Sequence, residues 1–195
     1  KEFLVTDFGA KGDSVTDCTI AFKKAINACN NSGGGRVVVP KGNYSTGAIY
    51  LKSNVNLHLD DNSRILFYTN PEKYLPLVFT RFEGVECMNY SALIYAFNEQ
   101  NIAVTGNGTL DGQASDSNWW SWKGSKENKM PNQKEDVKKL NQMGEDNIPV
   151  SERVFGQGHY LRPNFIQFYK CQNILIEGVT ILRSPMWELH PVLSE

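Results

Sequence analysis

Short apolar runs that recur between single turn residues constrain the fold of this chain more than any other feature. Residues 165–168, 174–176 and 179–182 form three such runs, with Asn173 and Gly178 between them. The first two alternate with the period of two that is typical of half-buried strands. Strands this short, with corners of one or two residues, do not suit sandwich hairpins but suit a coil with sharp bends. The pattern predicts an all-β fold, a right-handed parallel β-helix.

An Asn residue recurs at the start of three alternating segments. Asn54, Asn101 and Asn173 each precede apolar residues at every second position. The 47 residues from Asn54 to Asn101 correspond to about two coils and the 72 residues from Asn101 to Asn173 to about three, since solenoid repeats run from roughly 20 to 50 residues. An Asn at the same corner of successive coils can satisfy backbone groups of the next coil. The alternative is three unrelated turn residues.

An amphipathic helix is predicted at residues 17–31. Asp17 can cap its start, and the glycines at 33–35 end it. Its apolar stripe consists of Ile20, Ala21, Ala25, Ala28 and Cys29. Because the first coil of a solenoid would otherwise expose its core and an unpaired strand edge, we expect this helix to cap the N-terminal end.

The periodic pattern stops between residues 113 and 160, which predicts an insertion that leaves the coil on one side. Long irregular segments in compact domains are often functional. The charged stretch 126–145 is expected to be solvated and mobile. Trp119, Trp120 and Trp122 either pin the insertion to the coil by burial or present a ring face to a sugar.

Composition and charge restrict the classes of partner. A net charge of −1 and the lack of a basic stripe with interleaved aromatics argue against nucleic acid as a partner. No apolar run approaches the ~20 residues of a membrane span.

Cys18 and Cys29 would lie about 16 Å apart on the predicted helix, beyond disulfide reach. No Cys/His cluster has zinc-like spacing, and no cofactor is expected. We predict a single domain over residues 1–195.

Several motifs resemble a known family. The opening segments VTDFGAKGD, TDCTIAF and GGRVVVP resemble those of many pectin-degrading β-helix proteins. More specific motifs are RFEGVECMNY at 81–90, LIYA at 93–96, GNGTLDGQ at 106–113 with Trp119-Trp120, Arg162-Pro163, and SPMWELHPV at 184–192. These are similar to glycoside hydrolase family 28, the polygalacturonases, and particularly to its bacterial exo-acting branch. The resemblance covers nearly the whole chain except the charged part of the insertion.

The resemblance implies inverting hydrolysis of α-1,4-linked galacturonate by two sets of carboxylates roughly 6.5–9.5 Å apart, without a metal. Family members carry those carboxylates in Asn-x-Asp and Asp-Asp motifs, followed by Gly-His-Gly and Arg-x-Lys, downstream of the segment similar to 184–192. None of these motifs occurs here, and Asp60-Asp61 lies too early, at a corner after a strand. We therefore expect no catalytic residue in this chain, with the catalytic groups downstream of Glu195.

The candidate substrate-binding residues are Arg162, Arg81, Trp187 and His190. Arginine suits a uronate carboxylate because its guanidinium can bind both oxygens. The alternatives are structural: Arg162 can pair with a neighbouring corner, and Arg81 with a nearby glutamate, at position 83 or 86. For the third and fourth candidates, strict alternation puts Trp187 and His190 on opposite faces, so either the pleat is distorted or one of them is core.

His58 and His159 have no partner in the sequence pattern that suggests chemistry. The implied partners are polygalacturonate or pectin oligosaccharides, and the implied location is secreted or periplasmic; Lys1 opens the chain without Met or an apolar leader, which favours a processed N-terminus. We expect the 113–160 insertion to narrow one end of the cleft and to favour exo action.

Two alternative functions remain. One is a pectate-lyase-like β-eliminating enzyme, for which no obvious Ca²⁺-binding Asp cluster is present. The other is a non-catalytic glycan-binding β-helix.

Overall fold

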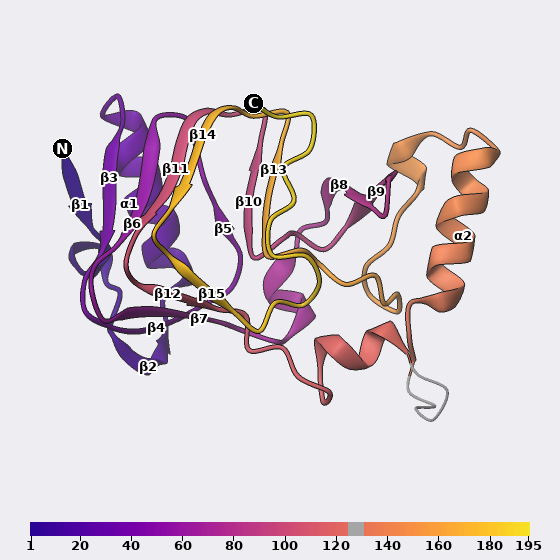
Figure 1. Cartoon of the computed structure of the whole chain (residues 1–195), viewed down its shortest axis with the longest axis horizontal. Coiled ribbons are helices and arrows are strands. Elements are labelled where there is room, and N and C mark those ends of the chain that lie inside the picture. Colours follow the sequence, from indigo (N-terminus) through magenta and orange to yellow (C-terminus); the bar gives the residue numbers. More distant parts are fainter. Residues whose placement is uncertain (125–130) are drawn as a thin grey trace.

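The computed structural model describes residues 1–124 and 131–195 and confirms a right-handed parallel β-helix (Figure 1). Three parallel sheets, here called walls A, B and C, follow one another along each coil. Wall A contains β1 (Glu2–Leu4), β3 (Gly35–Val39), β6 (Val55–Leu59), β11 (Gln100–Gly106) and β14 (Gln172–Glu177). Wall B contains β2 (Asp13–Asp17), β4 (Gly42–Thr46), β7 (Ser63–Phe67), β12 (Thr109–Asp111) and β15 (Thr180–Leu182). Wall C contains β5 (Ile49–Tyr50), β10 (Ile94–Phe97) and β13 (Ile166–Tyr169).

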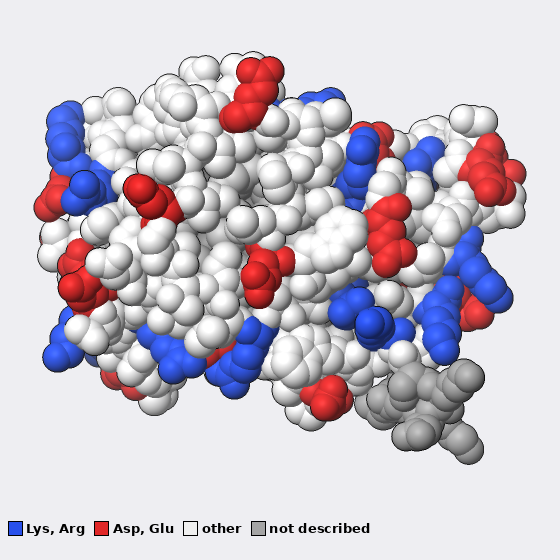
Figure 2. Space-filling model, viewed as in Figure 1, with Lys and Arg blue, Asp and Glu red and all other residues white. Residues whose placement is uncertain are grey.

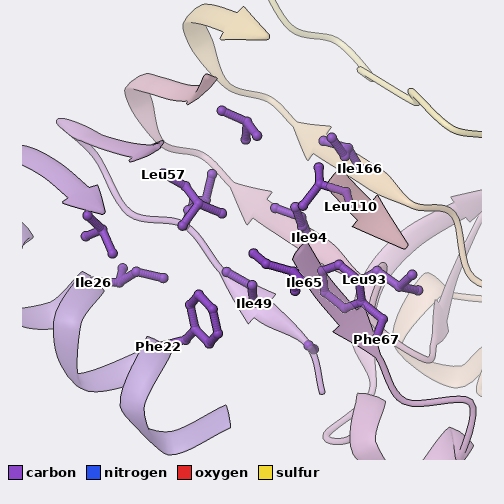
Figure 3. Packing of buried hydrophobic residues seen from close by; sticks show 14 of the residues in the cluster. Phe22, Ile26, Ile49, Leu57, Ile65, Phe67, Leu93, Ile94, Leu110 and Ile166 are labelled. Carbon is purple, nitrogen blue, oxygen red and sulfur yellow. The ribbon is translucent and has the colours of Figure 1, made fainter. Parts of the chain in front are cut away.

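The core lies inside the coil, where like positions of successive strands stack. Val37, Leu57 and Val104 are paired in register along wall A and are fully buried. Since successive side chains of a strand point to opposite faces, the neighbouring polar positions point out of the coil. Figure 3 shows the same arrangement across the interior, where Ile49 and Leu57 approach from different walls.

Helix α1 (Thr19–Asn31) follows β2 and precedes β3, so it takes the place of a wall C strand at the N-terminal end. It buries Phe22 and Ile26 toward the first full coil, as predicted for a cap (Figure 3). Two details were wrong. The helix begins at Thr19, whose N–H donates to Asp17 Oδ1 at 2.9 Å, and the residue at the N-cap position is Cys18. Ile20 is 59% exposed and does not belong to the buried stripe.

The three Asn residues form a ladder, but the predicted number of coils was wrong. β11 pairs directly with both β6 and β14, so each Asn-to-Asn interval is a single coil with a long excursion. Asn101 donates to Asn54 at 2.8 Å, and Asn173 donates to Asn101 at 2.7 Å. The amides bond to one another rather than to backbone groups. All three residues have a positive φ, which Asn tolerates better than most residues.

Apart from residues 5–12 of the first coil, which lie between β1 and β2, the excursions that lengthen the coils leave at one corner, between wall B and wall C. They comprise residues 47–48, 68–93, 112–165 and, before the bridge from Leu189 to Ile166, residues 183–188. The longest one contains the predicted insertion, and its described part is structured: η3 (Trp119–Lys123), α2 (Lys134–Glu145) and η4 (Val150–Glu152). Residues 134–145 of the stretch 126–145 form helix α2, the mobility predicted for this stretch stays a prediction, and residues 126–130 lie outside the described part.

Trp119, Trp120 and Trp122 were predicted either to pin the insertion to the coil or to present a ring to a sugar. Their burial decides between these two roles for Trp119 and Trp122. Trp119 is 1% exposed and packs against Tyr74 and Trp122. Trp122 also contacts the ring of Tyr160. These two pin the insertion to the coil. Trp120 is 41% exposed and lies on the surface.

A hairpin of β8 (Val78–Phe82) and β9 (Val85–Asn89) covers part of the outer face of wall C. Phe79 packs against Phe97 and Tyr169, so all four residues of β13 are buried and the half-buried alternation predicted there is wrong. Behind the hairpin, a second apolar cluster joins it to α2 (Figure 1). Its buried members are Phe82, Cys87, Leu140, Phe155 and Leu161.

The cysteine predictions are confirmed. All four cysteines are free and buried, including Cys18 and Cys29. No helix among the described residues is long and apolar enough to cross a membrane.

Candidate functional site

The outer face of wall C carries a column of polar and aromatic side chains. Tyr50, Tyr95 and Gln167 occupy matching positions of β5, β10 and β13, while the adjacent isoleucines point into the core. Leu189 is bridged to Ile166, which places His190 next in the column, beside Gln167. The parallel register of wall C therefore brings these residues into one row.

Hydrogen bonds fix the tautomer of His190. Its Nδ1 lies 2.9 Å from both Asn164 Nδ2 and Gln167 Nε2. Thr80 of the hairpin donates to Gln167 Oε1 at 2.6 Å, and in this orientation the Gln167 amide presents its NH₂ group to the imidazole. Nδ1 is thus an acceptor, and the proton of the neutral ring is on Nε2. Burial lowers the pKa of His190, and the positive charge of Arg81 lowers it further.

Trp187 lies against His190 despite the alternation rule. The ring centroids are 4.8 Å apart with an interplanar angle of 66°, and Trp187 is 45% exposed. The rule does not apply because residues 184–188 form bends rather than a strand, with only isolated bridges at Leu189 and Val192. The structure therefore brings both predicted residues together, and Trp187 lies on the surface of the described residues.

Arg162 and Trp120 hold the corner at residues 184–185. Arg162 Nη1 donates to the Pro185 carbonyl at 3.0 Å and its Nε to Gln133 Oε1 at 3.0 Å. Trp120 Nε1 donates to the Ser184 carbonyl at 2.9 Å. The corner contact considered for Arg162 is thus present, but both partners are neutral. Burial lowers the pKa of Arg162, and the charge of Glu83 partly opposes this effect.

Arg81 forms an ion pair with Glu86 at 3.1 Å, the second of its two considered structural partners. Tyr169 donates to the same carboxylate oxygen at 2.6 Å, and the guanidinium lies 5.9 Å from the Tyr169 ring centroid. The Tyr169 hydrogen bond lowers the pKa of Glu86, burial opposes it, and Arg81 adds to the lowering. Arg81 is therefore held in a network beside the column, where it acts on His190 through its charge.

The other two histidines lie elsewhere. His159 has a carboxylate partner, contrary to the sequence interpretation: its Nδ1 is 2.6 Å from Asp136 Oδ1, and Tyr160 N donates to Asp136 Oδ2 at 2.6 Å. This pair ties α2 to the chain that returns to the coil. His58, on wall A, bonds to Thr105 at 2.8 Å. Asp60-Asp61 lies at the start of a turn, as interpreted from sequence.

The residues that position His190 were missed in the sequence. Gln167 is a polar residue within an apolar strand, which is a usable signal, but Thr80 and Asn164 gave none. Asn164 is 5% exposed, and its Oδ1 has no hydrogen-bond partner among the described residues. This oxygen is therefore a buried acceptor that the described residues leave without a partner beside His190, and it has almost no exposed surface.

A second missed group lies on wall B. Asp111 has no exposed surface and binds Arg183 through two hydrogen bonds, at 2.8 and 2.6 Å, and also Arg64. These residues come from three successive coils. Among the described residues, no group of three or more His, Cys, Asp or Glu side chains is placed to hold a metal ion.

Comparison with known proteins adds to this geometry. The family described as "Rhamnogalacturonase A/epimerase, pectate lyase-like" matches residues 3–66. A probable polygalacturonase of Vitis vinifera is 28% identical over 97% of this chain and 34% of its own length. The exo-poly-alpha-D-galacturonosidase of Dickeya chrysanthemi is 34% identical over 57% of this chain and 19% of its own length.

The crystal structure of a hyperthermoactive exopolygalacturonase from Thermotoga maritima matches the whole chain with a TM-score of 0.97 and 55% identity. The chain is similar over its whole length to an exopolygalacturonase. The resemblance inferred from the motifs is confirmed. This exopolygalacturonase-like chain spans 44% of the Thermotoga structure and about a third of the Vitis relative.

Proposed function

We propose that a protein containing this chain hydrolyses α-1,4-galacturonosyl linkages of polygalacturonate with inversion, and that His190, Trp187 and Arg162 form part of its substrate-binding wall. The observation that carries the proposal is the built environment of His190, in a chain 55% identical to an exopolygalacturonase. Fold similarity alone would not suffice, because one fold hosts many activities.

The wall suits an acidic sugar. Neutral His190 offers its Nε2–H to a hydroxyl or carboxylate. The half-exposed Trp187 ring supplies a face for the apolar side of a pyranose. Arg162 is a cation whose hydrogen bonds go to neutral groups, so its charge remains for a carboxylate.

The catalytic carboxylates are proposed to lie outside these 195 residues, since the motifs that carry them in the family do not occur here. We expect the isolated chain to release no reducing ends from polygalacturonate, whereas the longer coding sequence gives an active enzyme. Product that absorbs in the ultraviolet, without a hydrolytic product, would instead assign a β-eliminating lyase.

The exo mode is proposed from what covers wall C. The hairpin lies over Tyr95 and Gln167, since the Tyr95 hydroxyl donates to the Phe79 carbonyl at 2.6 Å. Helix α2 of the 113–160 insertion packs behind that hairpin. The hairpin therefore blocks the path of a polymer bound on the His190 side. Only the end of a polymer chain can then enter the site. Viscosity measured against reducing-end release tests this proposal, and a steep early fall in viscosity would show internal cleavage.

A His190→Ala variant of the longer enzyme tests the wall directly. We expect kcat/KM to fall at least tenfold, about 1.4 kcal/mol of transition-state binding. His58→Ala is the matched control, since His58 lies on wall A, and it should retain wild-type kinetics. Wild-type kinetics in His190→Ala would assign His190 to structure alone.

A secreted or periplasmic location, with pectin of the cell wall as substrate, is part of the same proposal. A polymer is degraded where it is accessible, and fractionation of the source cells with an antibody to this chain tests the location. The assignment of residues 1–195 to a single domain also stays a proposal; a single cooperative unfolding transition followed by several probes would support it.

A further inference from the structure

A hollow lies where β5 meets α1, at the end of wall C opposite to His190. Its volume is about 420 Å³, within the range of roughly 300–1,000 Å³ of small-ligand sites. Ile49 and Tyr50 of β5 line it, and Tyr50 is 36% exposed. Helix α1 contributes Ile20, Lys23 and Asn27, and the chain after η2 (Pro71–Tyr74) contributes Leu75 and Pro76.

The charge around this hollow is positive. Lys23 and Lys52 line it and have no ion pair or hydrogen bond among the described residues. The third lysine, Lys73, is paired with Asp17 at 2.7 Å. On the face shown in Figure 2, acidic and basic side chains are interspersed. Two uncompensated ammonium groups beside one hollow are therefore a local feature of a chain whose net charge is −1.

We propose that this hollow, here called the α1 pocket, binds a segment of an acidic oligosaccharide. The two lysines meet carboxylates, Asn27 meets hydroxyls, and the surface of Ile20, Tyr50 and Pro76 meets the apolar faces of the sugar rings. A small inorganic anion would leave that apolar surface unused. An apolar ligand would leave both ammonium groups without a partner.

The α1 pocket is separate from the His190 wall. Tyr50 and His190 are three strand spacings apart in the column of wall C, roughly 14 Å. The hairpin lies over the positions between them. The choice of a uronate as the sugar rests on the proposed function, and the pocket would then hold the polymer near the enzyme by raising its effective concentration.

Isothermal titration calorimetry with trigalacturonate tests the pocket on the chain carrying His190→Ala, so that the wall contributes little. We expect Lys23→Ala/Lys52→Ala to raise Kd at least tenfold and added salt to weaken binding to the parent chain. Ile20→Trp should fill the hollow and abolish binding without changing any charge, since Ile20 is exposed. Lys24→Ala is the matched control, an exposed lysine of the same helix outside the pocket, and should bind as the parent does.

Two further probes decide the class of ligand. Maltotriose, a neutral trisaccharide, and inorganic phosphate should each bind at least tenfold more weakly than trigalacturonate. Unchanged affinity in the double lysine variant, or equal affinity for either probe, would overturn the proposal. Activity of the longer enzyme is measured separately, so loss of the proposed function and loss of this pocket are distinguishable.

Discussion

His190 shows how strongly one residue depends on partners that are distant in sequence. Its tautomer follows from Thr80 through Gln167, and its charge state responds to Arg81. The sequence motif SPMWELHPV indicated that His190 lies in a wall, because the motif resembles a family segment. The donors that hold the ring could not be predicted, since they come from the hairpin and from another coil.

We predict that His190 titrates with a pKa below the usual value of about 6.5. Two-dimensional NMR that correlates ring protons with both nitrogens should show the neutral ring protonated at Nε2. Arg81→Met should raise this pKa, since it removes a nearby cation, whereas Lys170→Met, an exposed change, should leave it unchanged. A protonated Nδ1 in the neutral ring would contradict the hydrogen-bond assignment.

The same lowered pKa makes a prediction about stability. The unfolded chain binds the His190 proton more tightly than the folded chain, so this group disfavours folding as pH falls below about 6.5 and has no such effect well above it. The free energy of unfolding in urea should therefore fall less between pH 7 and pH 5 in His190→Gln than in the parent chain. An identical pH dependence of the two would contradict this.

Among the elements, the Asn ladder was predicted in its position but not in its bonding. The alternating pattern after Asn54, Asn101 and Asn173 was sufficient to identify wall A. The number of coils predicted from the spacing was too high because each interval includes a long excursion. The excursions do not change the register in which β6, β11 and β14 pair. Periodicity in sequence reports strands, while pairing between coils depends on hydrogen bonds that a sequence interval does not reveal.

We predict that Asn101→Ala lowers the free energy of unfolding by about 1–2 kcal/mol, because Ala tolerates the positive φ poorly and two ladder bonds are lost. Asn101→Gly loses the same two bonds but accepts the backbone conformation, so it should cost less. Equal losses in the two variants, measured by urea unfolding, would show that backbone conformation contributes nothing at this corner.

Asp111 connects three strands of wall B, and its ionisation should be visible in acid. Burial opposes the charged form, but hydrogen bonds from Arg183, the Gln113 N–H and Arg64 outweigh it and lower the pKa of Asp111. Its stabilisation is thus present above the unfolded value of about 3.9 and is lost as pH falls through the lower folded pKa. We predict that Asp111→Asn destabilises the coil by about 1–3 kcal/mol at pH 7, with a smaller difference from wild type near pH 2. Asp116→Asn, an exposed change, is the control.

On the scale of the whole molecule, the described residues form two apolar clusters, one inside the coil and one between the hairpin and α2. The sequence predicted the first through its short alternating strands. It missed the second because the charged residues of α2 outnumber its apolar ones, and the buried contacts of Leu140 and Asp136 depend on β9 and on the return to the coil.

Because the second cluster is small, α2 should open independently of the coil. Asp136→Ala removes the acceptor of Tyr160 N and the partner of His159. We predict that amide hydrogen exchange in α2 accelerates by about 10–100-fold, while protection in walls A and B stays within twofold. Asp146→Ala, at the exposed end of the same helix, should leave both unchanged. Loss of protection throughout the coil would show one cooperative unit.

The location of the excursions of the second to fifth coils at one corner has an evolutionary consequence. The strands of wall C pair in the same register whether the segment at that corner is as short as residues 47–48 or as long as residues 112–165. Segments can therefore be lengthened, exchanged or grafted at this corner without reshaping the scaffold, and all of them arrive beside the same face. Descendants of such a chain can diversify which ends of a polymer they admit while inheriting an unaltered frame.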